Sequence, residues 1–195
     1  MSLLESGIGN SIRASRPFHQ RTRERGLVIN GHPDPRPERF CAALCRAWVA
    51  GAAAAGQEAD TISLGEIFPA EGQSGTDQLA KALDALRNRA RLMVVFPLWL
   101  DNPPEIVTRF FEHVARDCDP GLRNCHAHVL VTMSLPAFAH RSIARGSAGA
   151  DRLQNAISLV GVEIDALNFV GSVDSLSLTQ REEWLHRLRR LGTGR

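Results

Sequence analysis

The strongest constraint on the fold is a regular alternation between short apolar runs and longer segments with helical spacing. The clearest run, residues 92–96, is apolar at every position, as expected for a parallel strand covered on both faces, and Pro97 predicts its end. Similar short runs lie at residues 27–30, 60–64, 128–133 and 164–170. Strict alternation of this kind predicts an α/β domain with a five-stranded parallel sheet, in the order 2-1-3-4-5, and helices on both faces.

The helical segments are marked by apolar residues three or four positions apart and by residues typical of helix ends. Pro37 predicts the start of the first helix and Gly56 its end. Residues 151–160 predict a helix before the fifth strand, and Thr179 with Glu182 predicts a capping box for the last helix. The residues expected to face the core are Phe40, Leu44, Trp48, Leu79, Leu83, Leu86, Ile106, Val107, Phe110, Phe111, Val114, Trp184, Leu188 and Leu191.

Length and composition are typical of one globular domain with a polar arm. The chain has 195 residues, 44% hydrophobic and 23% charged, which suffices for a core without disulfides. Residues 1–25 are polar and rich in arginine, so we expect a mobile basic arm followed by a domain over 26–195. A net charge of +2 does not favour nucleic-acid binding, and no apolar run is long enough to span a bilayer. With no continuous apolar segment near the N-terminus, we expect a cytoplasmic location.

The four cysteines do not follow a metal-binding pattern. Cys41 and Cys45 lie four residues apart on a predicted helix, whereas Cys118 and Cys125 are far away in the sequence. Because no Cys-x-x-Cys motif occurs, we expect free thiols in a reducing compartment and no metal site.

Ligand chemistry is expected at three loops. In a parallel α/β sheet, ligands bind beyond the carboxyl ends of the strands, near the point where the strand order reverses. This rule selects the loops after the first, third and fourth strands, at residues 31–39, 97–103 and 134–145. We therefore expect these loops to meet at one edge of the sheet.

Each loop offers a different contact. The first contains three prolines and leads into a helix start, where Arg36 and Arg39 are suited to a phosphate and His32 to a further hydrogen bond. In the second loop, Trp99 offers a flat wall for a planar ring, and in the third His140 follows apolar surface. Considered alone, the first loop could equally be a rigid surface turn whose arginines face solvent. Trp99 alone could equally be a residue of the core. Together the loops suit a phosphorylated planar cofactor, for which a flavin is the natural candidate.

Four segments resemble a known family: LVINGHPDPRPERFCAAL, MVVFPLWLDNPPEIVTRFFEHV, VLVTMSLPAFAHR and LVGVEIDALNFVGSV. They are similar to the flavodoxin-like NAD(P)H:quinone oxidoreductases, a group with DT-diaphorase-like enzymes, drug-activity modulators and ancillary reductases of potassium-efflux systems. The resemblance spans about residues 27–191. It implies a flavodoxin-like fold and FMN or FAD bound non-covalently at a homodimer interface. It also implies hydride transfer from NAD(P)H to a quinone or similar acceptor.

The same resemblance implies which residues contact the flavin. Because the flavin carries the redox chemistry, no catalytic side chain is assigned, and His140 is only a candidate. The cofactor-binding residues implied by motif position are His32, Arg36, Arg39, Phe40, Pro97, Leu98, Trp99, Leu100, Thr132, Met133 and Ser134.

The chain departs from the motifs of that family. Relatives carry a small hydroxyl residue where Arg36 or Pro37 stands, and glycines at positions 101–102 and often 133–134. Some relatives use a tyrosine near the active site, and this chain contains none.

Two alternatives to an oxidoreductase remain open. One is a non-catalytic relative with lost or weakened flavin binding, acting as a dimeric regulatory or binding protein. The other is a hydrolase of a nucleotide or phosphate ligand on the same fold, for which Asp34 and Asp101 are the nearby carboxylates to test. Neither a Gly-x-Gly-x-x-Gly turn nor a Walker loop occurs, which disfavours a Rossmann-type dinucleotide site and a P-loop.

Overall fold

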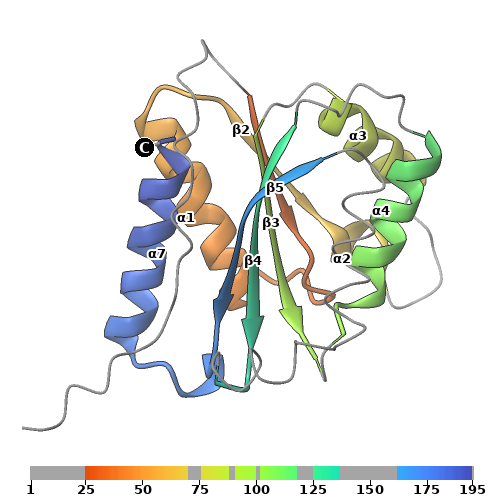
Figure 1. The fold of residues 1–195 in the computed structure, drawn as a ribbon. Coiled ribbons are helices and arrows are strands. Elements are labelled where there is room, and N and C mark those ends of the chain that lie inside the picture. The colour runs from red at the N-terminus through yellow and green to blue at the C-terminus, as the bar shows by residue number, and fades with distance from the viewer. Residues whose placement is uncertain are drawn as a thin grey trace, which may run out of the picture.

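The computed structural model describes most of the predicted domain (Figure 1). The described residues are 25–69, 76–87, 91–99, 102–117, 125–136 and 162–194. Outside them lie residues 1–24 of the predicted arm, the helix expected over 151–160, Leu100, Asp101, Cys118 and His140.

Five parallel strands form one sheet at the centre of the molecule (Figure 1). The strands are β1 (Gly26–Asn30), β2 (Ala59–Ser63), β3 (Arg91–Leu98), β4 (His126–Met133) and β5 (Glu163–Val170). They pair in parallel in the order β2-β1-β3-β4-β5, which confirms the predicted topology. The order reverses between β1 and β3, so the crevice beyond their carboxyl ends is the expected ligand position.

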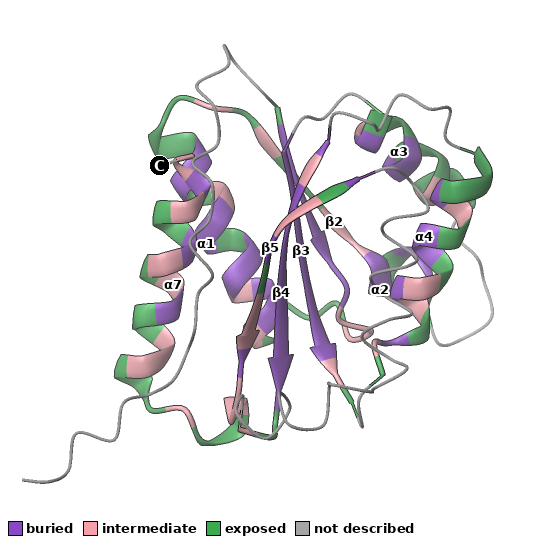
Figure 2. Ribbon diagram, in the orientation of Figure 1, coloured by how far each residue is buried: buried purple, intermediate pink, exposed green. Residues whose placement is uncertain are grey.

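Helices cover both faces of this sheet (Figure 1). On one face lie α1 (Phe40–Ala54) and α7 (Leu178–Gly192), and on the other α2 (Leu64–Ile67), α3 (Thr76–Arg87) and α4 (Glu105–Asp117). The central strands lie between two apolar clusters. Figure 2 shows that most of their residues are buried. Of the expected core residues, Leu44, Trp48, Leu83, Leu86, Val107, Phe110, Phe111, Val114, Trp184 and Leu188 are buried, and Phe40, Leu79, Ile106 and Leu191 are partly buried.

Helices α1 and α7 approach each other through two glycines. A Cβ atom at Gly51 would overlap the backbone carbonyl of Arg189, and one at Gly192 would overlap the carbonyl of Trp48. Because each glycine admits the backbone of the opposite helix, the pair fixes how far α7 lies along α1.

The start of α1 corrects the sequence prediction. The helix begins at Phe40 rather than at Pro37, because Arg39 keeps an extended backbone, with ψ 140°, and serves as the N-cap. The Arg39 N–H donates to the Arg36 carbonyl at 3.2 Å, which makes the preceding residues a turn. The predicted end is confirmed, since Gly56 follows the helix with a left-handed φ of 71°.

Pro97 does not end the third strand, which continues to Leu98. Strand β1 pairs with β3 only as far as Val95, whose carbonyl accepts the Gly31 N–H at 2.7 Å. Alternate residues of a strand direct their backbone polar groups to the same side, so the Pro97 nitrogen faces the space where β1 has already ended. No hydrogen bond of the sheet is lost there, and Pro97 stays in register with Thr132 of β4.

The capping box of α7 lies two residues earlier than predicted. The Ser177 hydroxyl accepts the Gln180 N–H at 3.2 Å, and the Gln180 side chain accepts the Ser177 N–H at 2.9 Å. The motif spacing occurs twice in this segment, and the helix starts at its first occurrence, which places Thr179 inside the helix.

Three thiols, those of Cys41, Cys45 and Cys125, are free and buried, as the sequence predicts. Burial raises the pKa of Cys41 to about 11 and that of Cys125 to about 12, and it also raises the pKa of Cys45. Within the described ranges, no helix is both long and apolar enough to cross a membrane.

Candidate functional site

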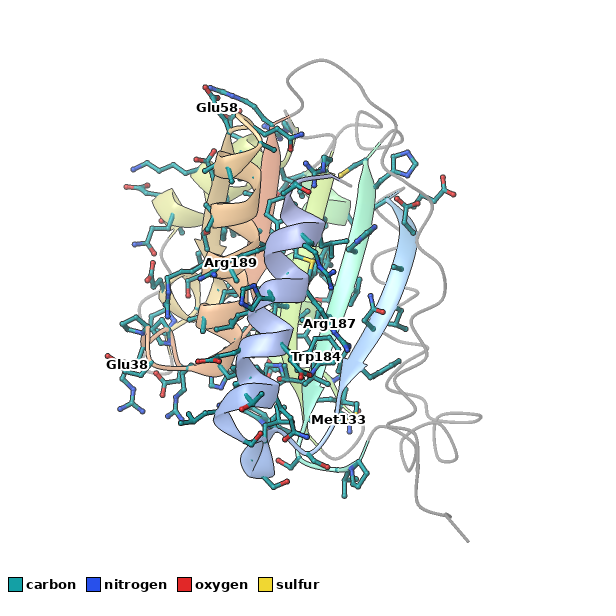
Figure 3. All side chains as sticks on the ribbon, turned by 90° about the vertical axis from the view of Figure 1, so that its left-hand side faces the viewer. Glu38, Glu58, Met133, Trp184, Arg187 and Arg189 are labelled. Carbon is teal, nitrogen blue, oxygen red and sulfur yellow. The ribbon has the colours of Figure 1, made fainter. Side chains whose placement is uncertain are left out.

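A pocket of about 560 Å³ lies at the carboxyl edge of the sheet. The loops after β1, β3 and β4 all contribute to its lining, so the three loops selected from the sequence meet. Figure 3 places Glu38 and Met133, which line the pocket, toward the end of the molecule at which the strand arrows end. Glu58 marks the opposite end.

Most of the residues implied by the family resemblance line this pocket. Arg36 is exposed and does not line it, and Leu100 and the candidate His140 lie outside the described residues. The predicted residues that line it are His32, Arg39, Phe40, Pro97, Leu98, Trp99, Thr132, Met133 and Ser134. The lining residues that were not predicted as cofactor-binding are Pro33, Asp34, Glu38, Cys41, Val173, Asp174 and Arg181.

Trp99 forms an aromatic wall at the end of β3. Its side chain is 52% exposed, and its ring lies edge-on to that of His32, with centroids 6.1 Å apart and planes at 87°. The Trp99 N–H donates to the Asn102 carbonyl at 3.0 Å, and the Asn102 N–H returns a bond of 2.9 Å. The Trp99 backbone N–H is therefore already paired, which leaves the indole face as the surface that this residue offers to a ligand.

His32 is held in one neutral form. Its ring Nδ1 accepts the backbone N–H of Asp34 at 3.0 Å, and the backbone N–H of His32 donates to the Asn30 side-chain oxygen at 3.2 Å. Burial, together with the nearby charge of Arg39, lowers the pKa of His32 from 6.5. At neutral pH the imidazole therefore carries its proton on Nε2, where it is a hydrogen-bond donor.

Asp34 binds both arginines of the first loop. Its carboxylate accepts Arg36 Nη2 at 2.6 Å and Arg39 Nε at 2.7 Å, and it also pairs with Arg39 Nη2. Hydrogen bonds from Arg36 hold the pKa of Asp34 well below its usual range. The carboxylate is thus ionised and engaged, which does not favour its use as a hydrolytic nucleophile. It also offsets part of the positive charge that the two arginines offer to an anion.

The start of α1, whose first residues line the pocket, has N–H groups that find no acceptor within the helix. Arg39 makes no side-chain cap, and the first turn contains no acidic residue. The first intrahelical bond runs from the Ala43 N–H to the Arg39 carbonyl at 3.1 Å, so the N–H groups before it have no acceptor within the helix. Phe40 and Cys41 both line the pocket, and the Cys41 thiol lies 3.4 Å from the Thr132 hydroxyl of β4. The helix dipole makes this a favourable place for an anion.

A fourth loop, between β5 and α7, also contributes to the lining. Ser172 adopts a left-handed backbone with φ 54°, and its N–H donates to the Leu135 carbonyl at 3.0 Å. This bond joins the loops after β4 and β5 and precedes the short 3-10 helix η3 (Val173–Ser175) at the pocket rim. The rule that selected the other loops would have found this one if applied to the fifth strand, whereas no local motif marks Arg181 on α7.

The described residues fit a planar ring with an anionic tail better than a metal ion. The exposed Trp99 face suits the ring, and the open helix start with Arg39 and Arg181 suits the tail. Asp34, pairing with Arg39, moderates the positive charge. In this part of the chain, no three His, Cys, Asp or Glu side chains gather into a metal-binding group.

A five-stranded parallel sheet with a pocket at its switch point defines a doubly wound α/β protein. A sequence profile described as a flavodoxin-like fold matches residues 24–184, and the chain belongs to this family. A search of curated protein sequences finds no match.

Solved structures share this architecture at low sequence identity. The NAD(P)H:quinone oxidoreductase from Methanothermobacter marburgensis is 17% identical, with a TM-score of 0.66 over 88% of this chain and 96% of its own. An FMN-dependent NADH-azoreductase from Bacillus anthracis, in complex with FMN, is 11% identical, with a TM-score of 0.64 over 87% and 98%. An NADH:FMN oxidoreductase in its apo form is 17% identical, with a TM-score of 0.62 over 87% and 88%. At these identities, the similarity establishes the fold.

Proposed function

We propose that this protein is a flavin-dependent oxidoreductase that transfers a hydride from NAD(P)H, through FMN or FAD, to a quinone or similar acceptor. The observation that carries the proposal is the exposed indole of Trp99 beside His32, in the same pocket as an uncapped helix start. Two structural neighbours, a quinone oxidoreductase and an FMN-dependent azoreductase, support it. The flavin, when bound, supplies the redox chemistry.

In this proposal, the chain binds and orients the cofactor. Trp99, Pro97 and Leu98 provide the wall along the ring, and Thr132, Met133 and Ser134 flank its other edge. The N–H groups at the start of α1 hold the anionic tail, next to the neutral His32 donor. Arg36, Arg39, Phe40 and Leu100 remain predicted cofactor contacts.

The proposed assembly is a homodimer with the flavin site at its interface. Trp99 and Leu135, which follow β3 and β4 at the carboxyl edge of the sheet, are 52% and 51% exposed. A second copy of the chain covering this edge would shield the ring of the cofactor from water. Sedimentation velocity of the flavin-loaded protein tests this part of the proposal, and a monomer at micromolar concentration would contradict it.

The function is tested by loading the purified protein with FMN or FAD and then removing free flavin. We expect a yellow protein whose absorbance is bleached by NADH or NADPH without oxygen and restored by a quinone. A protein that takes up neither flavin would contradict the proposal in favour of a non-catalytic relative. A bound flavin that neither nucleotide reduces would contradict the oxidoreductase activity alone.

A further inference from the structure

The side chain of Arg181, from the last helix α7, lies over the first residue of helix α1. The Arg181 guanidinium carbon of α7 is 5.0 Å from the centre of the Phe40 ring, and both residues line the pocket. Phe40 is the first residue of α1, and α1 and α7 pack side by side on the same face of the sheet (Figure 1). Two residues far apart in the sequence therefore meet at the start of α1, where the first N–H groups have no side-chain cap.

Two backbone carbonyls fix the orientation of this guanidinium. Arg181 Nη2 donates to the Val173 carbonyl at 2.8 Å, and Nε donates to the Leu176 carbonyl at 3.4 Å. A guanidinium has five N–H donors in a rigid plane, so these two bonds hold the group while leaving donors for a ligand. The cation–π contact with the Phe40 ring adds a third interaction that holds the guanidinium in place.

The charge of Arg181 is less compensated than that of the first-loop arginines. Arg36 and Arg39 both pair with the carboxylate of Asp34. Within the described residues, no ion pair joins Arg181 to a carboxylate, although Glu38 and Asp174 also line the pocket. An oriented cation beside the first N–H groups of a helix is well suited to binding a phosphate.

We propose that Arg181 recognises the phosphate of the flavin tail, an inference that rests on the proposed flavin site. Its guanidinium donates to the phosphate oxygens from α7, while α1 donates from its backbone. The main cationic contact to the tail thus comes from the C-terminal helix, and Arg39 contributes less because it shares its charge with Asp34.

Comparing FMN with riboflavin, which has the same ring system but no phosphate, isolates this contact. We expect the wild-type protein to bind FMN more tightly than riboflavin, with both dissociation constants measured from the change in flavin fluorescence. Arg181→Met keeps an unbranched side chain but removes the charge. It should weaken FMN binding by about 10- to 100-fold, as for the loss of a hydrogen bond to a charged group, and leave riboflavin binding within about 3-fold.

Arg187→Met is the matched control on the same helix. The Arg187 guanidinium carbon lies 4.9 Å from the centre of the Trp184 ring (Figure 3), much as that of Arg181 lies over Phe40. Arg187 does not line the pocket. This variant should bind both flavins like the wild type. Equal losses for FMN and riboflavin in Arg181→Met, or no loss, would overturn the inference and leave the proposed function standing.

If Arg181→Met fails to fold, the affinities of the wild-type protein for FMN and riboflavin still test the inference. Equal affinity for FMN and riboflavin would mean that the phosphate is not recognised, which overturns the role of Arg181. A wild-type protein that binds no flavin of any kind would overturn both this inference and the proposed function.

Discussion

Gly65 of α2 supports the backbone of the loop that carries His32. A Cβ atom at Gly65 would overlap the Pro33 carbonyl oxygen and would lie 3.0 Å from the His32 oxygen, whereas ordinary contacts begin at 3.4 Å. The helix itself cannot retreat easily, because its neighbouring residues Leu64 and Ile67 are buried in the core. We therefore expect Gly65→Ala to displace the loop by roughly 1 Å, and His32 with it.

The expected loss of stability in Gly65→Ala is the balance of two opposing effects, and the expected loss of activity follows from the displaced loop. Alanine is better than glycine in a helix by about 1 kcal/mol, but overpacking costs about 1–3 kcal/mol, so the free energy of unfolding should fall by about 1 kcal/mol. A displacement of about 1 Å in a positioning loop costs up to about 100-fold in a reaction that depends on geometry. The measurements are the thermal midpoint, the dissociation constant for FMN and the rate of flavin reduction by NADPH.

Gly56→Ala is the control for stability alone. Gly56 has a left-handed φ of 71° and no atom within 4 Å of its ideal Cβ position, so alanine there costs about 1–2 kcal/mol through backbone strain and contacts nothing. This variant should lose stability while keeping wild-type FMN binding and reduction. Wild-type values for Gly65→Ala in all three measurements, or an equal loss of FMN binding in Gly56→Ala, would refute the displacement of the loop.

Three further predictions concern the ring wall, the buried histidine and the thiols. Trp99→Ala should weaken FMN binding by about 10-fold with the thermal midpoint unchanged, while Trp99→Phe retains most of the affinity; full affinity in the alanine variant would contradict the wall. Burial lowers the pKa of His128 from 6.5 to about 4, so the unfolded state binds more protons between these values. The free energy of unfolding should therefore fall by about 1.4 kcal/mol for each pH unit from about 6.5 down to about 4, and in His128→Gln it should depend less on pH when measured by denaturation over this range. Cys41, Cys45 and Cys125 should resist iodoacetamide at pH 8 in the native protein and react after unfolding, as peptide mass spectrometry can measure; rapid native labelling would mean that these sites open.

The architecture could be predicted from the sequence because burial on both faces leaves a direct trace in the apolar runs. The apolar run at residues 92–96 lies at the centre of β3. The rule that ligands bind where the strand order reverses predicted that the loops of His32 and Trp99 would meet, and the two rings are in contact. The ends of elements were less predictable, since they depend on local geometry. Pro37 has the right residue type for a helix start, but Arg39 keeps the extended backbone that delays the helix.

The charges of the site could not be predicted from residue types. By residue type alone, Arg36 and Arg39 are suited to binding a phosphate. In the structure, however, both pair with Asp34, which lies two and five positions away in the chain. Arg181 has no motif of its own, and its position over Phe40 depends on how α7 packs against α1. Such contacts follow from tertiary packing, which periodicity does not encode.

The glycine contact between α1 and α7 has a consequence for the order of assembly. Of the described elements, α7 is the last to leave the ribosome, whereas the strands and loops of the pocket precede it. The contact of α7 with Gly51 determines the position of α7 along α1, and therefore the position of Arg181 over Phe40. A nascent chain in which only β1 to β5 have left the ribosome would have the aromatic side of the pocket but not Arg181. Under the role proposed for Arg181, the affinity for a phosphorylated ligand would then increase late in synthesis.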